Sequence, residues 1–287
     1  MTSPNSENLA KLTWESAVIW LREQPSQRNL VRDCYYDDPL EASAERFYRS
    51  EEAEELLRLV KRHLPCRVLD LGAGRGISSY AFARAGAVVT ALEPDPSPLV
   101  GAGAIENLAT AARVPITVVR EFGEHLPFPD GGFQVVYARA VLHHAKDLSQ
   151  LCREAARVLK PGGMFIATRE HVLSKKEDLP QFLASHPLHK LYGGEHAYLL
   201  DEYTEAIKAA GLTMGQCWGP FDSVINYFPT TRIEFETDVA RWLRRRFPSL
   251  LARQLAAFPP VQRYYGKKMS RLSNLPGRLY SFIALKP

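Results

Sequence analysis

The chain has 287 residues, a formal net charge of +4 and 46% hydrophobic residues, which is the composition of an ordinary soluble globular protein with one large core. It has no run of about 18 apolar residues, which excludes a transmembrane helix. Residues 1–8 lack the apolar core of a signal peptide. The four cysteines are scattered without a Cys-x-x-Cys pair, so we expect a reduced, cytoplasmic protein without paired-cysteine zinc.

Residues 9–63 have a helical pattern. An amphipathic helix around Trp14 and Trp20 ends near Pro25, and a second helix covers Glu51–His63. The segment Asp33–Pro39 between them is expected to be a loop. We therefore predict that residues 1–64 form an N-terminal helical extension.

From residue 66 onward, short apolar runs alternate with amphipathic segments. This alternation is typical of a parallel sheet with helices on both of its faces. The predicted strands are Arg67–Leu71, Ala87–Leu92, Ile116–Val119, Phe133–Tyr137, Met164–Thr168 and Leu212–Trp218. The predicted helices are Ile77–Ala85, Pro98–Ala112, the helix that follows Asp147, and Asp201–Ala210.

A glycine-rich turn follows the first strand. Gly72, Gly74 and Gly76 alternate with single residues, so the backbone can adopt positive φ and approach a ligand at the positive end of the next helix. Asp70 precedes the turn, and its carboxylate would repel a pyrophosphate but pair with an ammonium or sulfonium group. Glu93, at the end of the second strand, can accept both ribose hydroxyls of an adenosine. The predicted ligand is a cationic amino-acid nucleoside.

This stretch resembles the Asp-x-Gly-x-Gly-x-Gly motif of class I S-adenosylmethionine-dependent methyltransferases. Three further stretches resemble the same family: Leu126–Phe128, Val141–His144 and Leu159–Gly163. The resemblance covers about residues 66–170. It implies S-adenosylmethionine as cofactor, S-adenosylhomocysteine as product, and an α/β, Rossmann-like sheet of seven strands. Six strands would be parallel and the seventh, Arg278–Lys286, antiparallel.

The same resemblance divides the chain into parts. Residues 65–221 and 277–287 would form the cofactor-binding core, with a lid insertion at residues 172–200, and residues 222–276 a helical, basic insertion. Both insertions leave from the carboxyl ends of strands, where ligands bind in such sheets, so we expect them to cover the substrate.

The expected cofactor contacts lie at the ends of the strands. In the family, an Asp before Leu-Pro-Phe meets the adenine amino group, but Phe122 stands there in this chain. We expect adenine to be bound by backbone groups near Phe122 and Gly123, by ring stacking, or by Glu121. The full predicted set is Asp70, Gly72, Ala73, Gly74, Gly76, Glu93, Pro94, Phe122, Gly123, Ala138 and Arg139.

The predicted catalytic residues follow the fourth and fifth strands. Methyl transfer is an in-line displacement, and a hydroxyl acceptor also needs a base that is neutral near pH 7, usually histidine. The candidates are His143, His144, His171 and Glu170, and the substrate contacts are Arg169, His186, His189 and Tyr192. A metal held by His186, His189, Glu195 and His196 is conceivable, but we expect no metal.

The charge distribution leaves other functions open. After Asp238 the chain has eleven basic residues and no acidic one, interleaved with aromatic residues. Such a segment suits an anionic substrate, RNA or a membrane surface, or it is a solvated helical face.

The sequence favours methyl transfer to an O or N atom of a small or medium-sized metabolite, and a hydroxylated or anionic acceptor more than an apolar one. A nucleic-acid methyltransferase is the alternative, although no Asn/Asp-Pro-Pro-Tyr run follows the fourth strand. An NAD(P)-dependent oxidoreductase is disfavoured by the glycine spacing and by Asp70. A binding module without turnover is disfavoured by the intact glycine turn and Glu93.

Overall fold

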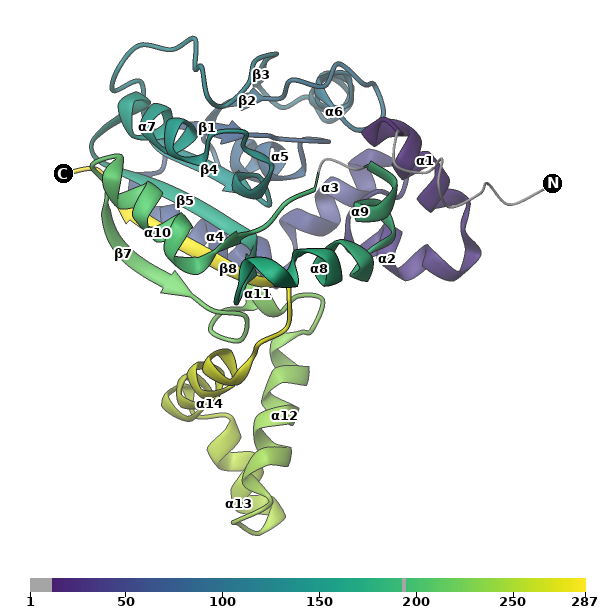
Figure 1. Cartoon of the computed structure of the whole chain (residues 1–287), viewed down its shortest axis with the longest axis vertical. Coiled ribbons are helices and arrows are strands. Elements are labelled where there is room, and N and C mark those ends of the chain that lie inside the picture. Colours follow the sequence, from purple (N-terminus) through teal and green to yellow (C-terminus); the bar gives the residue numbers. More distant parts are fainter. Residues whose placement is uncertain (1–11, 193–194) are drawn as a thin grey trace.

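The fold is organised around one mixed sheet (Figure 1). The computed structural model describes residues 12–192 and 195–287; the first residues, on which the signal-peptide expectation rests, lie outside this range. The strand order is β3-β2-β1-β4-β5-β8-β7, with β6 paired to β5. The bounds are β1 Arg67–Leu71, β2 Val88–Leu92, β3 Ile116–Val119, β4 Phe133–Arg139, β5 Leu159–Leu173, β6 Tyr198–Leu199, β7 Thr213–Trp218 and β8 Arg278–Leu285.

The predicted fold class is confirmed, with one correction to the strand count. β8 runs antiparallel to both of its neighbours, β5 and β7, and the remaining pairs are parallel. The described residues form eight strands rather than seven, because the two-residue β6 joins the far end of β5.

Strand β5 extends well beyond its predicted end at Thr168. After a bulge it continues to pair with β8, so that Glu170 lies opposite Tyr280 and Val172 opposite Arg278. The first two residues of the lid insertion that we expected at 172–200 therefore belong to β5, which ends at Leu173. This extension carries the polar residues Glu170 and His171 into the sheet.

Alternate residues of the strands face two separate layers of helices. On one face, Leu69, Val136 and Phe165 pack with α7 and α10. On the other face, Val68, Tyr137 and Ile166 pack with α4 and α5. The bounds of these helices are α4 Glu51–Val60, α5 Ile77–Arg84, α7 Leu148–Val158 and α10 Leu200–Ala209. Both faces of the central strands are therefore buried, as in other parallel sheets.

Helices from two distant parts of the chain meet beyond the carboxyl ends of the parallel strands (Figure 1). Val18 and Leu21 of α1 share an apolar cluster with Leu188 and Leu191 of α9. The N-terminal helices are α1 Trp14–Glu23, α2 Arg28–Asp33 and α3 Leu40–Tyr48, and those after β5 are α8 Leu179–Ser185 and α9 Pro187–Tyr192. α6, Ala102–Ala112, follows β2.

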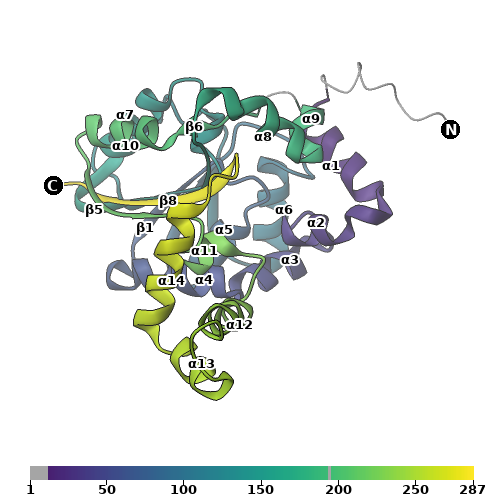
Figure 2. The same cartoon turned by 60° about the horizontal axis from the view of Figure 1, so that its bottom comes forward.

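The predicted helical insertion forms an arm that projects from the body (Figures 1 and 2). It contains α12, α13 and α14, which pack on one another through a small core of their own around Phe235, Val239 and Ala252. That this insertion covers the substrate stays a prediction: α11, at its start, packs on α4, β5 and β8, whereas α12–α14 extend away from the body. The bounds are α11 Val224–Tyr227, α12 Arg232–Leu243, α13 Ser249–Ala256 and α14 Pro259–Leu272.

Within the described part of the chain, none of the helices combines the length and the apolar character that a membrane span requires.

Candidate functional site

The glycine turn connects β1 to α5 with three glycines in the left-handed region. The φ angles of Gly72, Gly74 and Gly76 are +56°, +53° and +81°. A Cβ on Gly72 would lie 2.8 Å from Val141, whereas a Cβ on Gly74 would meet only a backbone oxygen at 4.0 Å. The space beside Gly74 is therefore open to a ligand, while Gly72 is needed for packing.

Replacing Gly72 by alanine should destabilise the protein more than the same change at Gly86. Both positions have positive φ, but nothing lies within 4 Å of a Cβ at Gly86. The contact with Val141 should add about 1–3 kcal/mol to the loss at Gly72. Urea denaturation of the two variants measures this difference, and equal losses would contradict the packing role of Gly72.

Two buried carboxylates flank the turn. Glu93 accepts hydrogen bonds from the Gly74 N–H at 2.8 Å and the Asp95 N–H at 3.0 Å. Asp70 accepts a hydrogen bond from the Ser79 hydroxyl at 2.6 Å. Burial raises the pKa of each carboxyl to about 7. A cationic ligand would stabilise the ionised forms, which fits a sulfonium nucleoside and not a pyrophosphate.

The raised pKa values predict a loss of stability with rising pH. Carboxyls in the unfolded chain ionise near pH 4, whereas the pKa of Asp70 is about 7 in the folded protein. The folded state thus binds more protons in this window, and stability falls as the pH rises from about 4 to 7. Asp70→Asn should show a smaller fall in unfolding free energy between pH 5 and pH 8; unchanged pH dependence would contradict the assignment.

The residues that we expect to contact the adenine lie in the loop after β3. The Phe122 ring is 55% exposed, and the Lys146 ammonium lies 5.6 Å from its centre. The Phe122 N–H donates to Glu121, and Gly123 packs against Leu151. Pro94 is half-buried directly after Glu93. The exposed face of Phe122 is available for stacking on a flat ring, the role that we expected for it.

Three of the predicted cofactor contacts have other side-chain partners. The Arg139 guanidinium pairs with Glu52 of α4 at 2.8 Å and lies over the rings of Tyr35 and Phe47, so it is not directed at the glycine turn. The side chains of Ala73 and Ala138 are buried in apolar clusters. These alanines can meet a ligand only through their backbone groups.

Glu170 holds the turn that follows β4. Its carboxylate is fully buried and accepts hydrogen bonds from the N–H groups of Val141, Leu142 and His143, at 3.0, 3.1 and 3.2 Å. It also lies 2.7 Å from Nδ1 of His143. Burial raises the pKa of Glu170, while the three N–H groups favour its ionised form. All these contacts make Glu170 a positioning residue rather than a free base.

The His143 ring is oriented by this carboxylate. Burial lowers the pKa of His143 to about 3, so the ring is neutral. A neutral imidazole that donates Nδ1–H to Glu170 has its free electron pair on Nε2. This Nε2 lies 3.7 Å from Glu195, and Nε2 of His144 lies 3.9 Å from the same carboxylate. The structure thus groups His143, His144 and Glu195.

The remaining predicted histidines pack together beside this group. The Nδ1 of His171 lies 2.9 Å from the Gly277 carbonyl, and burial lowers its pKa well below 6.5. His189 packs between Phe182 and His186. His186 lies between α8 and α9, and its Nδ1 accepts the Leu188 N–H at the start of α9. His186 and His189 thus belong to the packing of the lid helices.

Two predicted substrate contacts have structural partners. Arg169 donates to the carbonyl of Ile225 at 2.8 Å, so it anchors α11. The ring of Tyr192 packs edge-on against Trp14 of α1, with 5.2 Å between their centres. Both residues therefore have structural partners, and their contact with the substrate stays a prediction.

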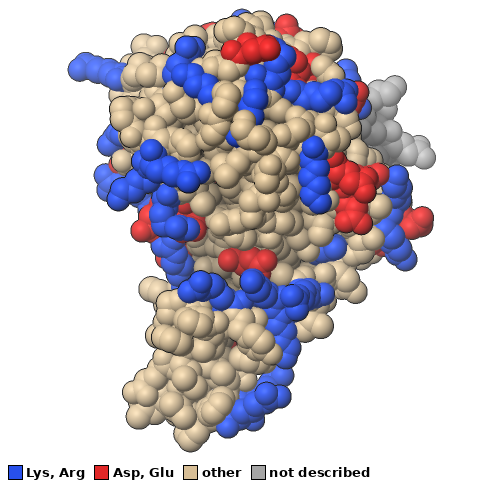
Figure 3. All heavy atoms as spheres, turned by 90° about the vertical axis from the view of Figure 1, so that its left-hand side faces the viewer, with Lys and Arg blue, Asp and Glu red and all other residues tan. Residues whose placement is uncertain are grey.

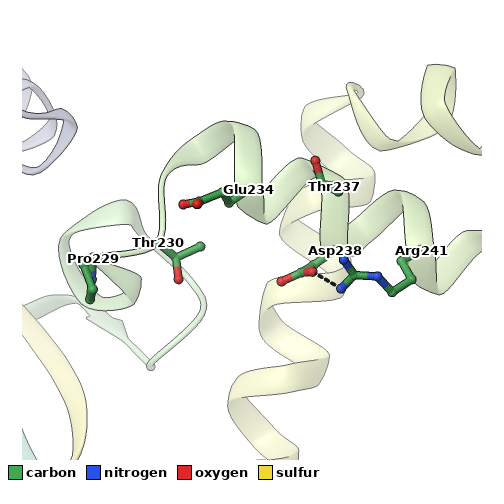
Figure 4. A pocket seen from close by; sticks show the side chains of 6 residues that line it. All are labelled: Pro229, Thr230, Glu234, Thr237, Asp238 and Arg241. Atoms are coloured by element: carbon green, nitrogen blue, oxygen red, sulfur yellow. Dashed lines mark hydrogen bonds and ion pairs between the residues drawn. The ribbon is translucent and has the colours of Figure 1, made fainter.

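A hollow on the arm does not belong to the site. It is lined by residues of α12 and the segment before it, and an ion pair between Asp238 and Arg241 lies in it (Figure 4). The lining residues are Pro229, Thr230, Glu234, Thr237, Asp238 and Arg241.

Sequence reasoning missed two buried acids. Glu195 was considered only together with lid histidines, and its grouping with His143 depends on a contact across more than 50 positions. Glu52 is one of several acids at the start of the predicted helix Glu51–His63, yet it is 1% exposed and pairs with Arg139. No local signal distinguishes either residue from its exposed neighbours.

Comparison with known proteins gives the same picture of the core. Residues 69–167 match the methyltransferase domain family. The chain is 34% identical over 54% of its length to a ubiquinone biosynthesis O-methyltransferase of Methylobacterium nodulans, and 30% identical over 51% to the uncharacterized methyltransferase YcgJ of Bacillus subtilis. It spans 64% and 59% of the length of these two relatives.

A solved structure shares the fold over nearly the whole chain. It is a geranyl diphosphate C-methyltransferase from Streptomyces coelicolor, in complex with Mg²⁺, geranyl diphosphate and S-adenosylhomocysteine. The TM-score is 0.56 with 15% sequence identity, and the match covers 96% of this chain and 98% of that one.

Proposed function

We propose that this chain, which carries a class I S-adenosylmethionine-dependent methyltransferase domain, transfers a methyl group from S-adenosylmethionine to an oxygen or nitrogen atom of a small or medium-sized metabolite. One observation supports this most. Val141 lies against Gly72, and the turn that follows it carries His143 and His144. Only a few residues therefore separate the predicted donor site at the glycine turn from His143 and His144.

In this proposal the residues around the glycine turn bind the donor. Glu93 accepts the ribose hydroxyls, the ionised Asp70 faces the positively charged end of the donor, and Phe122 stacks on the adenine. The open side of Gly74 lets the backbone approach the ligand. S-adenosylmethionine supplies the electrophilic methyl group, so the chain mainly has to align donor and acceptor.

The acceptor meets the group formed by His143, His144 and Glu195. A hydroxyl acceptor must lose a proton before or during transfer. Two imidazoles and a carboxylate suit a hydroxylated acceptor better than an apolar one. The name of the Methylobacterium nodulans relative, an O-methyltransferase, supports oxygen as the acceptor atom.

The placement of the basic residues favours a small acceptor over RNA. Most of the basic residues after Asp238 lie on the arm α12–α14, which projects away from the glycine turn (Figures 1 and 2). An RNA bound along the arm would have its bases far from the turn.

A screen with isotopically labelled S-adenosylmethionine tests the proposal. The full chain and a Glu93→Ala variant are incubated with fractionated metabolite extract and, separately, with RNA. We expect a labelled small molecule and S-adenosylhomocysteine with the wild type and only traces with the variant. Labelled RNA, or no labelled product in any fraction, would overturn the proposal.

A further inference from the structure

The group formed by His143, His144 and Glu195 has the composition of a metal site. One ring nitrogen of each histidine and an oxygen of Glu195 lie within 4.8 Å of one another. The closest approaches are 3.7 Å from His143 and 3.9 Å from His144 to the carboxylate. Two ligand atoms bound to one first-row ion at about 2 Å lie roughly 3–4 Å apart, so a small inward movement would complete the site.

A buried oxygen of Glu195 lacks a partner. The side chain is 3% exposed, and among the described residues no donor lies within hydrogen-bond distance of its Oε2. Burying a carboxylate oxygen without a donor or cation is costly. The unpartnered atom is directed at Nε2 of His143, the atom that carries the free electron pair.

Glu170 contacts the other ring nitrogen of His143, Nδ1. Metal-binding histidines usually donate their other ring N–H to a carboxylate, which fixes the tautomer and the ring orientation. Glu170 stands 2.7 Å from Nδ1 of His143 and is itself held by three backbone N–H groups. The supporting residue of a metal ligand is thus already in place.

We propose that His143, His144 and Glu195 bind a divalent first-row transition ion, such as Zn²⁺ or Mn²⁺. Two imidazoles and one carboxylate suit these ions better than Ca²⁺ or Mg²⁺, which prefer oxygen ligands. Three protein ligands leave a coordination position for an acceptor oxygen. This role rests on the proposed function: the acceptor O–H releases its proton to solvent, the oxygen forms a bond to the methyl carbon, and the C–S bond breaks.

Metal binding can be measured without turnover. The full chain is freed of metal with a chelator and titrated with Co²⁺, whose visible absorption reports its ligands, and then with Zn²⁺ in competition. We expect one ion per chain, and at least about tenfold weaker binding for His144→Ala and Glu195→Gln. His63→Ala is the matched control, because His63 precedes β1 and the glycine turn follows it. This variant should bind the metal ion as the wild type does.

No stoichiometric binding, or equal binding by all variants, would overturn the metal site. S-adenosylmethionine affinity is measured on the same samples by calorimetry. Donor binding by a chain that binds no metal ion would overturn the metal proposal alone, whereas metal binding without donor binding would overturn the proposed function alone.

The tip of the arm supports a second, independent inference. Four large apolar side chains are exposed in and beside α13, among them Leu250 at 71% and Phe258 at 57%. The other two are Phe247 and Leu251. Arg244, Arg245 and Arg246 precede them and are also exposed. Basic side chains gather along one side of the arm, and uncharged surface covers its tip (Figure 3).

We infer that this tip docks on an anionic lipid surface. A helix in a membrane interface buries apolar residues at the level of the headgroups, while Lys and Arg contact anionic lipids. The segment after Asp238 has eleven basic residues and no acidic one, so its charge is complementary to such a surface. The adjacent exposed leucines, Leu250 and Leu251, add apolar surface that a lipid interface can bury.

Sedimentation with lipid vesicles tests this inference. The full chain should bind vesicles that contain phosphatidylglycerol and not pure phosphatidylcholine vesicles. A Leu250→Glu, Leu251→Glu variant should bind at least about tenfold more weakly. Ile233→Glu, which alters a residue 77% exposed at the start of α12, is the control and should bind normally. No binding to anionic vesicles, equal binding by the double variant, or binding of RNA alone would overturn the inference.

Discussion

Replacing Glu93 by alanine is expected to weaken S-adenosylmethionine binding about a hundredfold. The proposed function has this buried carboxylate accept both ribose hydroxyls, and hydrogen bonds to a charged group contribute about 1.5–3 kcal/mol each. The variant also leaves the N–H groups of Gly74 and Asp95 without their present acceptor. A loss of about 3 kcal/mol corresponds to a hundredfold change in Kd, which titration calorimetry resolves.

Glu106→Ala is the matched control for this variant. Glu106 is an acid of the same length, but it lies on the surface of α6 and pairs with Arg120 there. It should bind S-adenosylmethionine as the wild type does. A Glu93→Ala protein that is folded and binds the donor within about threefold of the wild type would contradict the ribose assignment.

Replacing Glu170 by alanine is expected to destabilise the protein by about 3–5 kcal/mol. The change removes the acceptor of three backbone N–H groups and of the His143 ring at once. Because the Leu142 and His143 N–H groups and the His143 ring are buried, their lost acceptor leaves them unpaired at high cost. This loss is a large share of the 5–15 kcal/mol by which native proteins are typically stable, and urea denaturation measures it.

Glu170→Gln separates the two roles of the residue. The amide keeps one acceptor oxygen but turns an NH₂ group toward donors, so we expect an intermediate loss of stability. If Glu170 also orients His143, this variant should lose methyl transfer while it keeps S-adenosylmethionine affinity. A Glu170→Ala protein within about 1 kcal/mol of the wild type would contradict the positioning role.

The parts of the structure that the sequence predicted are local. The glycine turn follows from residue type and spacing alone, because glycine is the residue that adopts positive φ at low cost. β1 and β3 have their predicted bounds because each is a short apolar run between turn signals. The start of α7 was predicted in the same way, because Asp is a preferred N-cap residue. In the structure the Asp147 side chain accepts the Gln150 N–H.

The parts that sequence reasoning missed depend on contacts between distant segments. Arg139 looked free for a ligand, but Glu52, 87 positions earlier, occupies its guanidinium. The length of β5 depends on pairing with β8, more than 100 positions away, which local propensity does not encode. The packing of the arm is a further example: its helices have apolar faces, and the sequence did not show that these faces bury one another.

The central claim is that the turn between β1 and α5 binds a sulfonium nucleoside. Its most direct test is titration calorimetry of the full chain with S-adenosylmethionine, S-adenosylhomocysteine and NAD. We expect the first two to bind with one molecule per chain and NAD to give no heat of binding. Binding of NAD without either methyl-donor ligand would contradict the account.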